Sequence, residues 1–200
     1  MTVILWLILS YLIGAVPFGL IIARTLCHVD PRTTGSGNIG ATNVARICGL
    51  RYGVATLLLD ISKGFFPVLV ATAMSESHTF VTLTGLAVLI GHMKSFFLHG
   101  KGGKGVATTI GIFLALAPIS TLLAVACGLG VIYYSGYVSL GSLCLTGLLP
   151  LFLLVSLNLG YLPLALIIFA LVFWAHGENI ERLKSGHENT WRKTQAVEPD

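Results

Sequence analysis

The feature that most constrains this chain is a 70-residue stretch, Val106 to Ala175, that contains no Asp, Glu, Lys, Arg or His. A stretch this long without an ionisable side chain has to lie in lipid, or inside protein that lipid surrounds. The rest of the chain agrees, because 55% of its 200 residues are hydrophobic and only 10% are charged, against roughly a quarter charged in soluble domains. A soluble globular fold is therefore nearly excluded.

Three breaks divide this stretch into four predicted helices: Pro118, the Tyr-Tyr-Ser-Gly-Tyr segment at 133–137, and the Asn-Leu-Gly-Tyr segment at 158–161. Three earlier apolar segments each have about the 17 to 25 residues that a membrane crossing needs. They are Thr2–Ala23, Gly53–Ala73 and Thr79–Leu98. The first has no basic start and no cleavage site, so we expect it to be retained rather than removed as a signal peptide. The sequence predicts an all-α integral membrane protein with seven transmembrane helices, some of them short, particularly the one ending near Pro118.

The basic residues set the orientation, because Lys and Arg near helix ends collect on the cytoplasmic side of a membrane. With the N-terminus outside, eleven of the twelve fall in three cytoplasmic segments, 24–52, 94–106 and 176–200, and the predicted outward turns contain none. The twelfth, Lys63, lies within the second span. We therefore expect one domain over residues 1–200, with a cytoplasmic C-terminus. The net charge of +4 is too small to indicate a nucleic-acid partner.

The first cytoplasmic segment contains a polar, glycine-rich stretch, Thr-Gly-Ser-Gly-Asn-Ile-Gly-Ala-Thr-Asn-Val-Ala-Arg, at 34–46. Glycine lets backbone N–H groups turn toward an anion, while Ser, Thr, Asn and Arg add side-chain donors. A plain turn before the second span explains these residues equally well. The candidate anion-binding residues here are Ser36, Gly37, Asn38, Gly40, Thr42, Asn43 and Arg46.

The second cytoplasmic segment contains His-Gly-Lys-Gly-Gly-Lys-Gly at 99–105 and leads directly into the fourth span. Two lysines among glycines at a helix start suit a phosphate, which gains backbone donors, the helix dipole and ammonium charge. This is not a Walker A loop, since Val106 stands where that motif requires Lys, so nucleotide hydrolysis is disfavoured. A basic topology signal with a flexible hinge is the alternative. The candidate residues are Lys101, Gly102, Gly103 and Lys104.

The third cytoplasmic segment begins where the seventh span ends. His176 and Asn179 stand three residues apart and share one helical face, which can present an imidazole and an amide to a site at the membrane surface. A lone histidine at this position is more often an interface anchor. Glu178 and Arg182 have the spacing of an ion pair on a solvated helix.

Two charged residues, Asp60 and Lys63, lie inside the second span. Charges at that depth are normally paired or turned toward a cavity. Their spacing permits an internal ion pair, and a role in lining the substrate cavity is the alternative. The chain has 23 glycines, and we expect most of those outside the loops to lie at close helix contacts. The four cysteines have neither disulfide nor zinc spacing, so we expect no metal and no cofactor.

These segments resemble the bacterial membrane family of acyl-phosphate:glycerol-3-phosphate acyltransferases, along almost the whole chain. Residues 35–43 with Arg46 are similar to the first family motif, Gly91-His92 with residues 101–108 to the second, and residues 176–180 to the third. The Asp60-x-x-Lys63-Gly64 segment and the turn at 138–140 are similar to family features as well. One departure is Gly177, where the family commonly has Arg, and Arg182 or Lys184 can compensate for it.

The resemblance implies transfer of a fatty acyl group from acyl phosphate to the 1-hydroxyl of glycerol 3-phosphate. The products are lysophosphatidic acid and phosphate, in the first step of phospholipid synthesis. The implied partners are these two substrates and the lipid bilayer of the bacterial inner membrane, with the active site facing the cytoplasm. Both substrates are anionic, and an acyl phosphate carries a good leaving group, so orientation and charge neutralisation are what it needs.

The roles that follow are hypotheses. Lys101 and Lys104, with the amides of Gly102 and Gly103, would hold the phosphate of glycerol 3-phosphate, and the residues of the 34–46 stretch would hold the acyl-phosphate head, or the reverse. His176 and Asn179 would orient the attacking hydroxyl. Either His176 or a substrate phosphate oxygen would then accept its proton. The predicted catalytic residues are Ser36, Arg46, Lys104, His176 and Asn179.

A small-anion transporter is the alternative function, because glycine-rich breaks and a buried ion pair would serve one too. Its weakness is asymmetry. Transporters usually carry polar groups near the midplane and often show an internal repeat, whereas the last four predicted spans have no ionisable residue before His176 and no repeat is evident.

Overall fold

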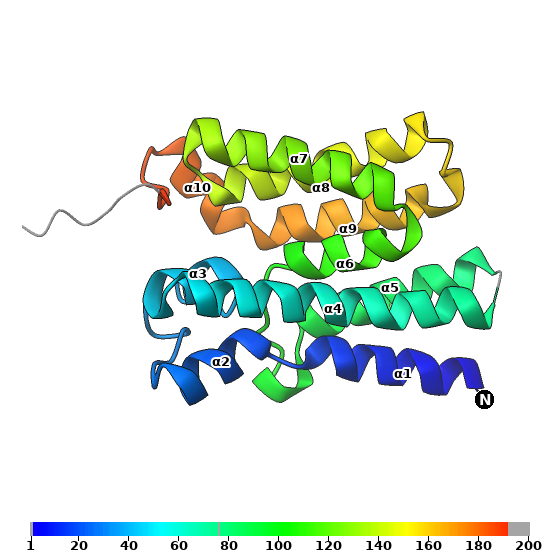
Figure 1. Cartoon of the computed structure of the whole chain (residues 1–200), viewed down its shortest axis with the longest axis horizontal. Helices are drawn as coiled ribbons and strands as arrows, with labels where there is room; N and C mark the ends of the chain where they lie inside the picture. Colours follow the sequence, from blue (N-terminus) through cyan, green and yellow to red (C-terminus); the bar gives the residue numbers. More distant parts are fainter. Residues whose placement is uncertain (1, 76, 192–200) are drawn as a thin grey trace, which may run out of the picture.

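The computed structural model describes residues 2–75 and 77–191, and every regular element in these ranges is helical (Figure 1). Arg192 and Lys193, part of the predicted cytoplasmic tail, lie outside the described residues. The elements are α1 (Thr2–Ala15), α2 (Phe18–Leu26), α3 (Ala41–Cys48), α4 (Leu50–Met74), α5 (His78–Met93), η1 (Phe96–Leu98), α6 (Val106–Leu116), α7 (Pro118–Ser135), α8 (Val138–Val155), η2 (Leu159–Tyr161), α9 (Leu162–Ala175) and α10 (Gly177–Lys184).

The three predicted breaks in the uncharged stretch are confirmed, because α6 ends before Pro118, α7 ends at Ser135, and η2 separates α8 from α9. Five segments of the described chain are long and apolar enough to cross a membrane. Leu159–Ala175 and Gly177–Lys184, which meet at a bend of 61°, make a sixth only when the two are counted as one span. Helix α6, with only 11 residues, is the short one expected before Pro118.

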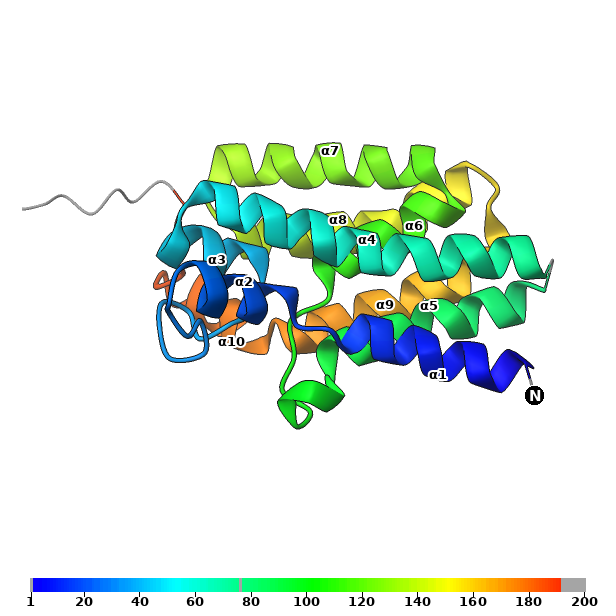
Figure 2. The ribbon, with the colours of Figure 1, turned by 60° about the horizontal axis from the view of Figure 1, so that its bottom comes forward.

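The long helices run side by side along the longest axis of the molecule (Figures 1 and 2). Helices α2, α3 and α10 gather at one end of this bundle, and the N-terminus and the turn at η2 lie at the other. Two loops contribute residues to the site described below. Loop one (residues 27–40) joins α2 to α3, and loop three (residues 94–105) joins α5 to α6. Loop one and α10 come from opposite ends of the sequence and meet at the same end of the fold.

The first predicted span is interrupted. Helix α1 ends at Ala15 and α2 begins at Phe18, because Pro17 has no N–H and pushes the preceding Val16 away from helical geometry. Side chains from elsewhere satisfy the freed carbonyls. Ser95 Oγ donates to Ala15 O at 2.6 Å, and Lys63 Nζ donates to Val16 O at 2.8 Å. The helix expected over Thr2–Ala23 is therefore two helices with a capped break.

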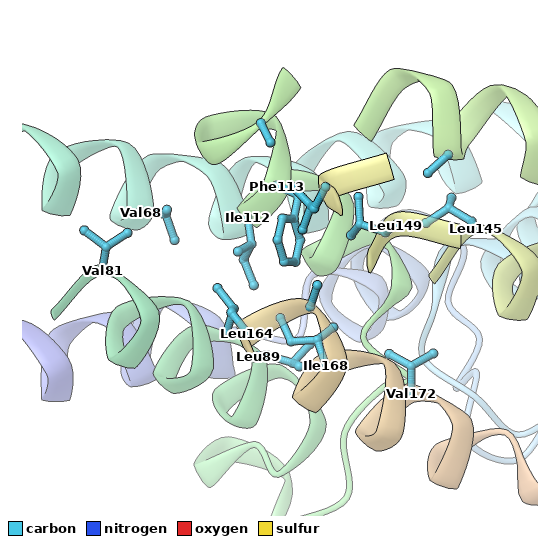
Figure 3. Packing of buried hydrophobic residues seen from close by; sticks show 14 of the residues in the cluster. Val68, Val81, Leu89, Ile112, Phe113, Leu145, Leu149, Leu164, Ile168 and Val172 are labelled. Atoms are coloured by element: carbon cyan, nitrogen blue, oxygen red, sulfur yellow. The ribbon is translucent and has the colours of Figure 1, made fainter. Parts of the chain in front are cut away.

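The short helix α6 lies at the centre of the core (Figure 3). Ile112 and Phe113 are fully buried there, among side chains of α4, α5, α8 and α9. Helix α4 packs on α6 through backbone contact: a Cβ on Gly64 would lie 2.3 Å from Thr108 O, and one on Gly111 would lie 2.0 Å from Ile61 O. At these two positions the expected use of glycine in close helix packing is confirmed.

Candidate active site

A pocket opens where four parts of the chain meet. Its walls come from loop one with α3, the end of loop three, the start of α8, and the α9–α10 junction with the residues that follow it. The lining residues are Ser36, Asn38, Gly40, Thr42, Asn43, Arg46, Lys104, Val138, Ser139, His176, Asn179, Arg182, Glu188 and Asn189. Three cationic side chains and one carboxylate are among them, so the pocket is polar and net positive.

Loop one is folded around the side chain of Asn43, which is almost fully buried. Its Nδ2 donates to the carbonyls of Pro31, Thr34 and Asn38 at 2.8–3.0 Å. Its Oδ1 accepts from the Ser36 N–H at 2.8 Å. One side chain therefore closes most of the loop and presents Ser36 and Asn38 to the pocket.

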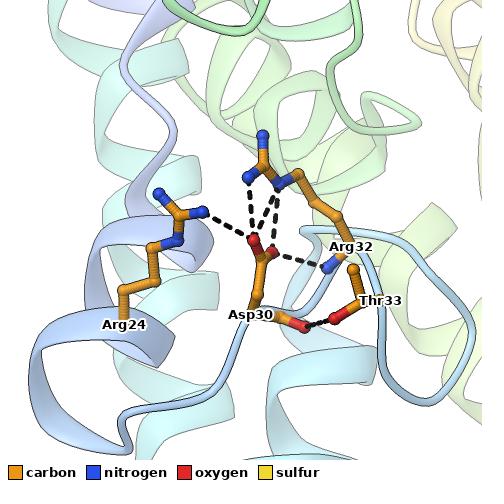
Figure 4. Close-up of polar contacts among 4 residues, drawn as sticks. All are labelled: Arg24, Asp30, Arg32 and Thr33. Atoms are coloured by element: carbon orange, nitrogen blue, oxygen red, sulfur yellow. Dashed lines mark hydrogen bonds and ion pairs between the residues drawn. The ribbon is translucent and has the colours of Figure 1, made fainter.

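A second set of contacts fixes the entrance to loop one (Figure 4). Asp30 accepts from Arg32 through both the backbone N–H and the guanidinium, and it pairs with Arg24 at 2.7 Å. Thr33 Oγ1 donates to Asp30 O. The hydrogen bonds from Arg32, with the charge of Arg24, hold the pKa of Asp30 well below its ordinary value. Arg24 and Arg32 thus support the loop rather than line the pocket.

Loop three brings Lys104 into the pocket. Its ammonium group donates a hydrogen bond to Asn179 Oδ1, which joins two of the predicted catalytic residues. Burial is the main cause that lowers the pKa of Lys104, and the charge of Arg182 lowers it further. The negative charge of a bound phosphate would raise the pKa of Lys104 again, so an anion in the pocket favours the charged form of this lysine.

The neighbouring residues of loop three have different partners. The N–H groups of Gly102 and Gly103 donate to the carbonyls of Met93 and His92 at 3.0 and 3.1 Å. Lys101 is exposed and does not line the pocket. The two amides that the sequence suggested as phosphate donors are therefore already bonded within the protein, because the loop runs against the end of α5.

At the α9–α10 junction, His176 is buried beside the pocket. Its Nδ1 lies 2.8 Å from Val172 O. A carbonyl only accepts, so Nδ1 carries the proton and Nε2 keeps its lone pair. Burial lowers the pKa of His176 to about 4, which keeps the ring neutral near pH 7.

The residues after α10 close the pocket with a carboxylate that the sequence analysis missed. Glu188 Oε1 accepts from Asn179 Nδ2 at 2.7 Å and from Ser139 Oγ at 3.1 Å, and its Oε2 accepts from Arg182 Nε at 2.9 Å. The available signal was weak: an acidic residue two positions after Gly186, in a tail that mixes acidic and basic residues. Arg182 also lies 3.6 Å from Glu178, the predicted surface ion pair.

Residues 4–186 match the family model described as glycerol-3-phosphate acyltransferase. The chain belongs to the glycerol-3-phosphate acyltransferase family. Among its relatives of that name, the protein of Lawsonia intracellularis is 50% identical over 97% of this chain and 98% of its own length, and that of Maridesulfovibrio salexigens is 52% identical over 95% and 97%.

The structure is also similar to crystal structures of PlsY (YgiH), described as an integral membrane glycerol 3-phosphate acyltransferase. The glycerol 3-phosphate form superposes with a TM-score of 0.91 at 42% identity, covering 96% of both chains. The lysophosphatidic acid form gives 0.89 at 41%, covering 95% of both. The present chain is therefore a multi-pass membrane acyltransferase, and these matches lend no support to the transporter alternative.

In this acyltransferase the pocket brings together nine of the thirteen candidate site residues, contributed by all three predicted cytoplasmic segments. Gly37, Lys101, Gly102 and Gly103 are not among its lining. Gly37 has a φ of +71°, so it serves a turn of loop one that L side chains rarely adopt. The pocket also contains Ser139, from the 138–140 turn that resembles a family feature.

The acyltransferase has glycine at 177, where the resemblance led us to expect an arginine. The structure shows which other basic residue lies near this position. A Cβ at Gly177 would meet no atom within 4 Å, so that position is open. Arg182 lines the pocket and Lys184 does not. Of the two residues that could compensate, Arg182 is the one in place.

The low pKa of His176 predicts a pH-dependent stability. Between about pH 6.5 and pH 4 the unfolded chain binds a proton at this residue and the folded protein does not, so stability is lost as the pH falls through this window. We expect the acyltransferase to lose about 2 kcal/mol from this residue between pH 8 and pH 5, or about 4 to 8 °C in Tm. His176→Gln keeps a donor to Val172 O but does not titrate. If its Tm falls as steeply as that of the wild type, the assignment is wrong.

Proposed function

We propose that the enzyme takes its acyl group from acyl phosphate and delivers it to the 1-hydroxyl of glycerol 3-phosphate. The observation that carries this proposal is the pocket itself, where Arg46, Lys104 and Arg182 surround two hydrogen-bonding groups, His176 and Asn179. Phosphate-bearing substrates match three cations in one small cavity. The apolar helices around the pocket suit the fatty chain of the donor and of the product. The lysophosphatidic acid form of the similar PlsY structure is consistent with such a product.

The phosphates divide between two walls in this proposal. Lys104 and Arg182 hold one phosphate beside Asn179, and Ser36, Asn38, Thr42 and Arg46 of the opposite wall hold the other. Gly40 lies against the Asn38 side chain, to which its N–H donates at 2.8 Å, and Asn43 shapes loop one from within. Which phosphate occupies which wall is exchangeable. We assign Lys101 no direct contact, because it is exposed outside the pocket.

In the proposed reaction the 1-hydroxyl oxygen attacks the acyl carbon of the mixed anhydride. The bond from that carbon to the phosphate oxygen breaks, and the electron pair leaves with the phosphate. The cations of the wall that holds the acyl phosphate, either Lys104 with Arg182 or Arg46, neutralise the charge that develops there. The proton ends on the departing phosphate. His176 Nε2 accepts the hydrogen bond of the attacking hydroxyl, but with a pKa of about 4 it is a weak base. We therefore favour a phosphate oxygen as the proton acceptor.

We further propose seven crossings, with the N-terminus outside and the pocket facing the cytoplasm of the bacterial inner membrane. The gathering of loop one and α10 at the end opposite the N-terminus supports this orientation. In oriented membrane vesicles, we expect an impermeant maleimide to label Cys27 from one face of the membrane and the cysteine of Ser77→Cys from the other face. Labelling of both from one face would refute the topology.

The purified protein in lipid should release phosphate only when acyl phosphate and glycerol 3-phosphate are both present, and lysophosphatidic acid should form in equal amount. A His176→Ala variant that is folded yet fully active would remove the role given to that residue. Absence of phosphate release, together with glycerol 3-phosphate or phosphate flux into vesicles, would instead support the transporter alternative.

A further inference from the structure

Asp60, Lys63 and His92 form a buried cluster of ionisable groups that does not line the active-site pocket. Lys63 Nζ lies 2.7 Å from Asp60 Oδ1, and His92 Nδ1 lies 3.8 Å from the same oxygen. All three side chains are at most 4% exposed. Of the two interpretations of Asp60 and Lys63, the structure has the internal ion pair. Charged side chains are costly inside a membrane span, so the presence of Asp60 and Lys63 there calls for an explanation beyond packing.

The ring of His92 lies directly against the backbone that precedes Lys104. A Cβ atom on Gly103 would lie only 2.3 Å from His92 Nε2, so a side chain there would collide with the ring. The Gly103 N–H also donates to His92 O at 3.1 Å. The imidazole therefore has one nitrogen toward Asp60 and the other toward loop three.

The same cluster reaches the break in the first span. Lys63 Nζ donates to Val16 O, a carbonyl that the break leaves without a helical partner. The beginning of loop three is fixed to α1 as well, since Tyr11 Oη donates to Lys94 O at 2.8 Å and Ser95 Oγ donates to Ala15 O. Loop three is thus held at its start by α1 and at its end by His92, one residue before Lys104.

We propose that Asp60, Lys63 and His92 are positioning residues for acyl transfer, which set the place of Lys104 through the backbone of Gly103. The ion pair fixes the carboxylate, the carboxylate faces the imidazole, and the imidazole supports the loop. This inference rests on the proposed function. A misplacement of about 1 Å in a reacting group costs about 100-fold in rate, so a small shift of loop three is enough to matter.

The test compares His92→Leu with His92→Gln. Leucine keeps an apolar volume but removes both nitrogens, and we expect kcat/KM for glycerol 3-phosphate to fall about 10-fold to 100-fold. Glutamine keeps a polar end group and should restore activity to within about threefold of the wild type. The matched control is His78→Leu, at the first residue of the same helix α5, about 21 Å along the axis from His92. It should leave kcat/KM unchanged.

A double-mutant cycle with Lys104→Met separates positioning from general destabilisation. If His92 acts through Lys104, the double variant is no slower than Lys104→Met alone. Additive losses, or a His92→Leu variant with wild-type kinetics, would overturn the inference. If His92→Leu does not fold, the same cycle with Asp60→Asn gives the answer. A wild-type protein that transfers no acyl group would refute the proposed function, which is a separate result.

Discussion

Replacing Lys104 with methionine is expected to lower kcat/KM for acyl transfer by about 10² to 10³-fold, the usual loss when one preorganised donor is removed from a developing negative charge. Methionine retains the length and burial of the side chain, so loop three keeps its shape. What disappears is the ammonium group that bonds Asn179 and faces the pocket. The measurement is steady-state release of phosphate at varied glycerol 3-phosphate.

Lys101 provides a matched control in the same loop. It is exposed and outside the pocket lining, so Lys101→Met changes the charge of the loop without changing the site. We expect its kcat/KM to stay within about threefold of the wild type, because solvent and salt screen the electrostatic effect of an exposed charge on the site. Equal losses in the two variants would mean that the loop acts through its overall charge, and the role given to Lys104 would fall.

Replacing Asn43 with aspartate is expected to be as damaging as replacing it with alanine, although aspartate differs only by exchanging the amide nitrogen for oxygen. The Asn43 amide donates to three backbone carbonyls, and a carboxylate would place negative oxygen against the same groups. Buried polar groups left without partners cost about 1 to 3 kcal/mol each. We expect a loss of at least about 3 kcal/mol in stability and at least 100-fold in kcat/KM.

The control for this prediction is Asn158→Asp, in the exposed turn before η2 at the opposite end of the molecule. Thermal unfolding and phosphate release are measured for both aspartate variants and for Asn43→Ala. A folded Asn43→Asp protein with normal kinetics would show that loop one is shaped by other contacts.

The helices and the three site segments could be predicted because their signals are local. Pro118, the Gly136 turn and the turn at Asn158 mark helix ends. A long stretch without charged residues indicates a lipid environment, whichever helices it packs against. Lys104, His176 and Asn179 were predictable for the same reason, since each stands at a helix boundary next to glycine or charge.

The interruption at Pro17 and the role of Glu188 depend on contacts between distant residues. The break is tolerable because Ser95 of loop three and Lys63 of α4 reach its carbonyls. Glu188 is recognisable as a site residue only when Ser139, 49 positions earlier, is placed beside it. The bonds that occupy the amides of Gly102 and Gly103 also come from tertiary packing, which the glycine pattern alone does not reveal.

The shortness of α6 has a consequence for donor choice. Eleven residues extend about 16 Å, whereas the 25 residues of α4 beside it extend about 38 Å. The residue in front of α6 is therefore recessed along the bundle instead of standing level with the longer helices. A reacting group has to descend to Lys104 between loop one and α10. We infer that such a recess favours a donor with a small headgroup, such as the acyl phosphate proposed above.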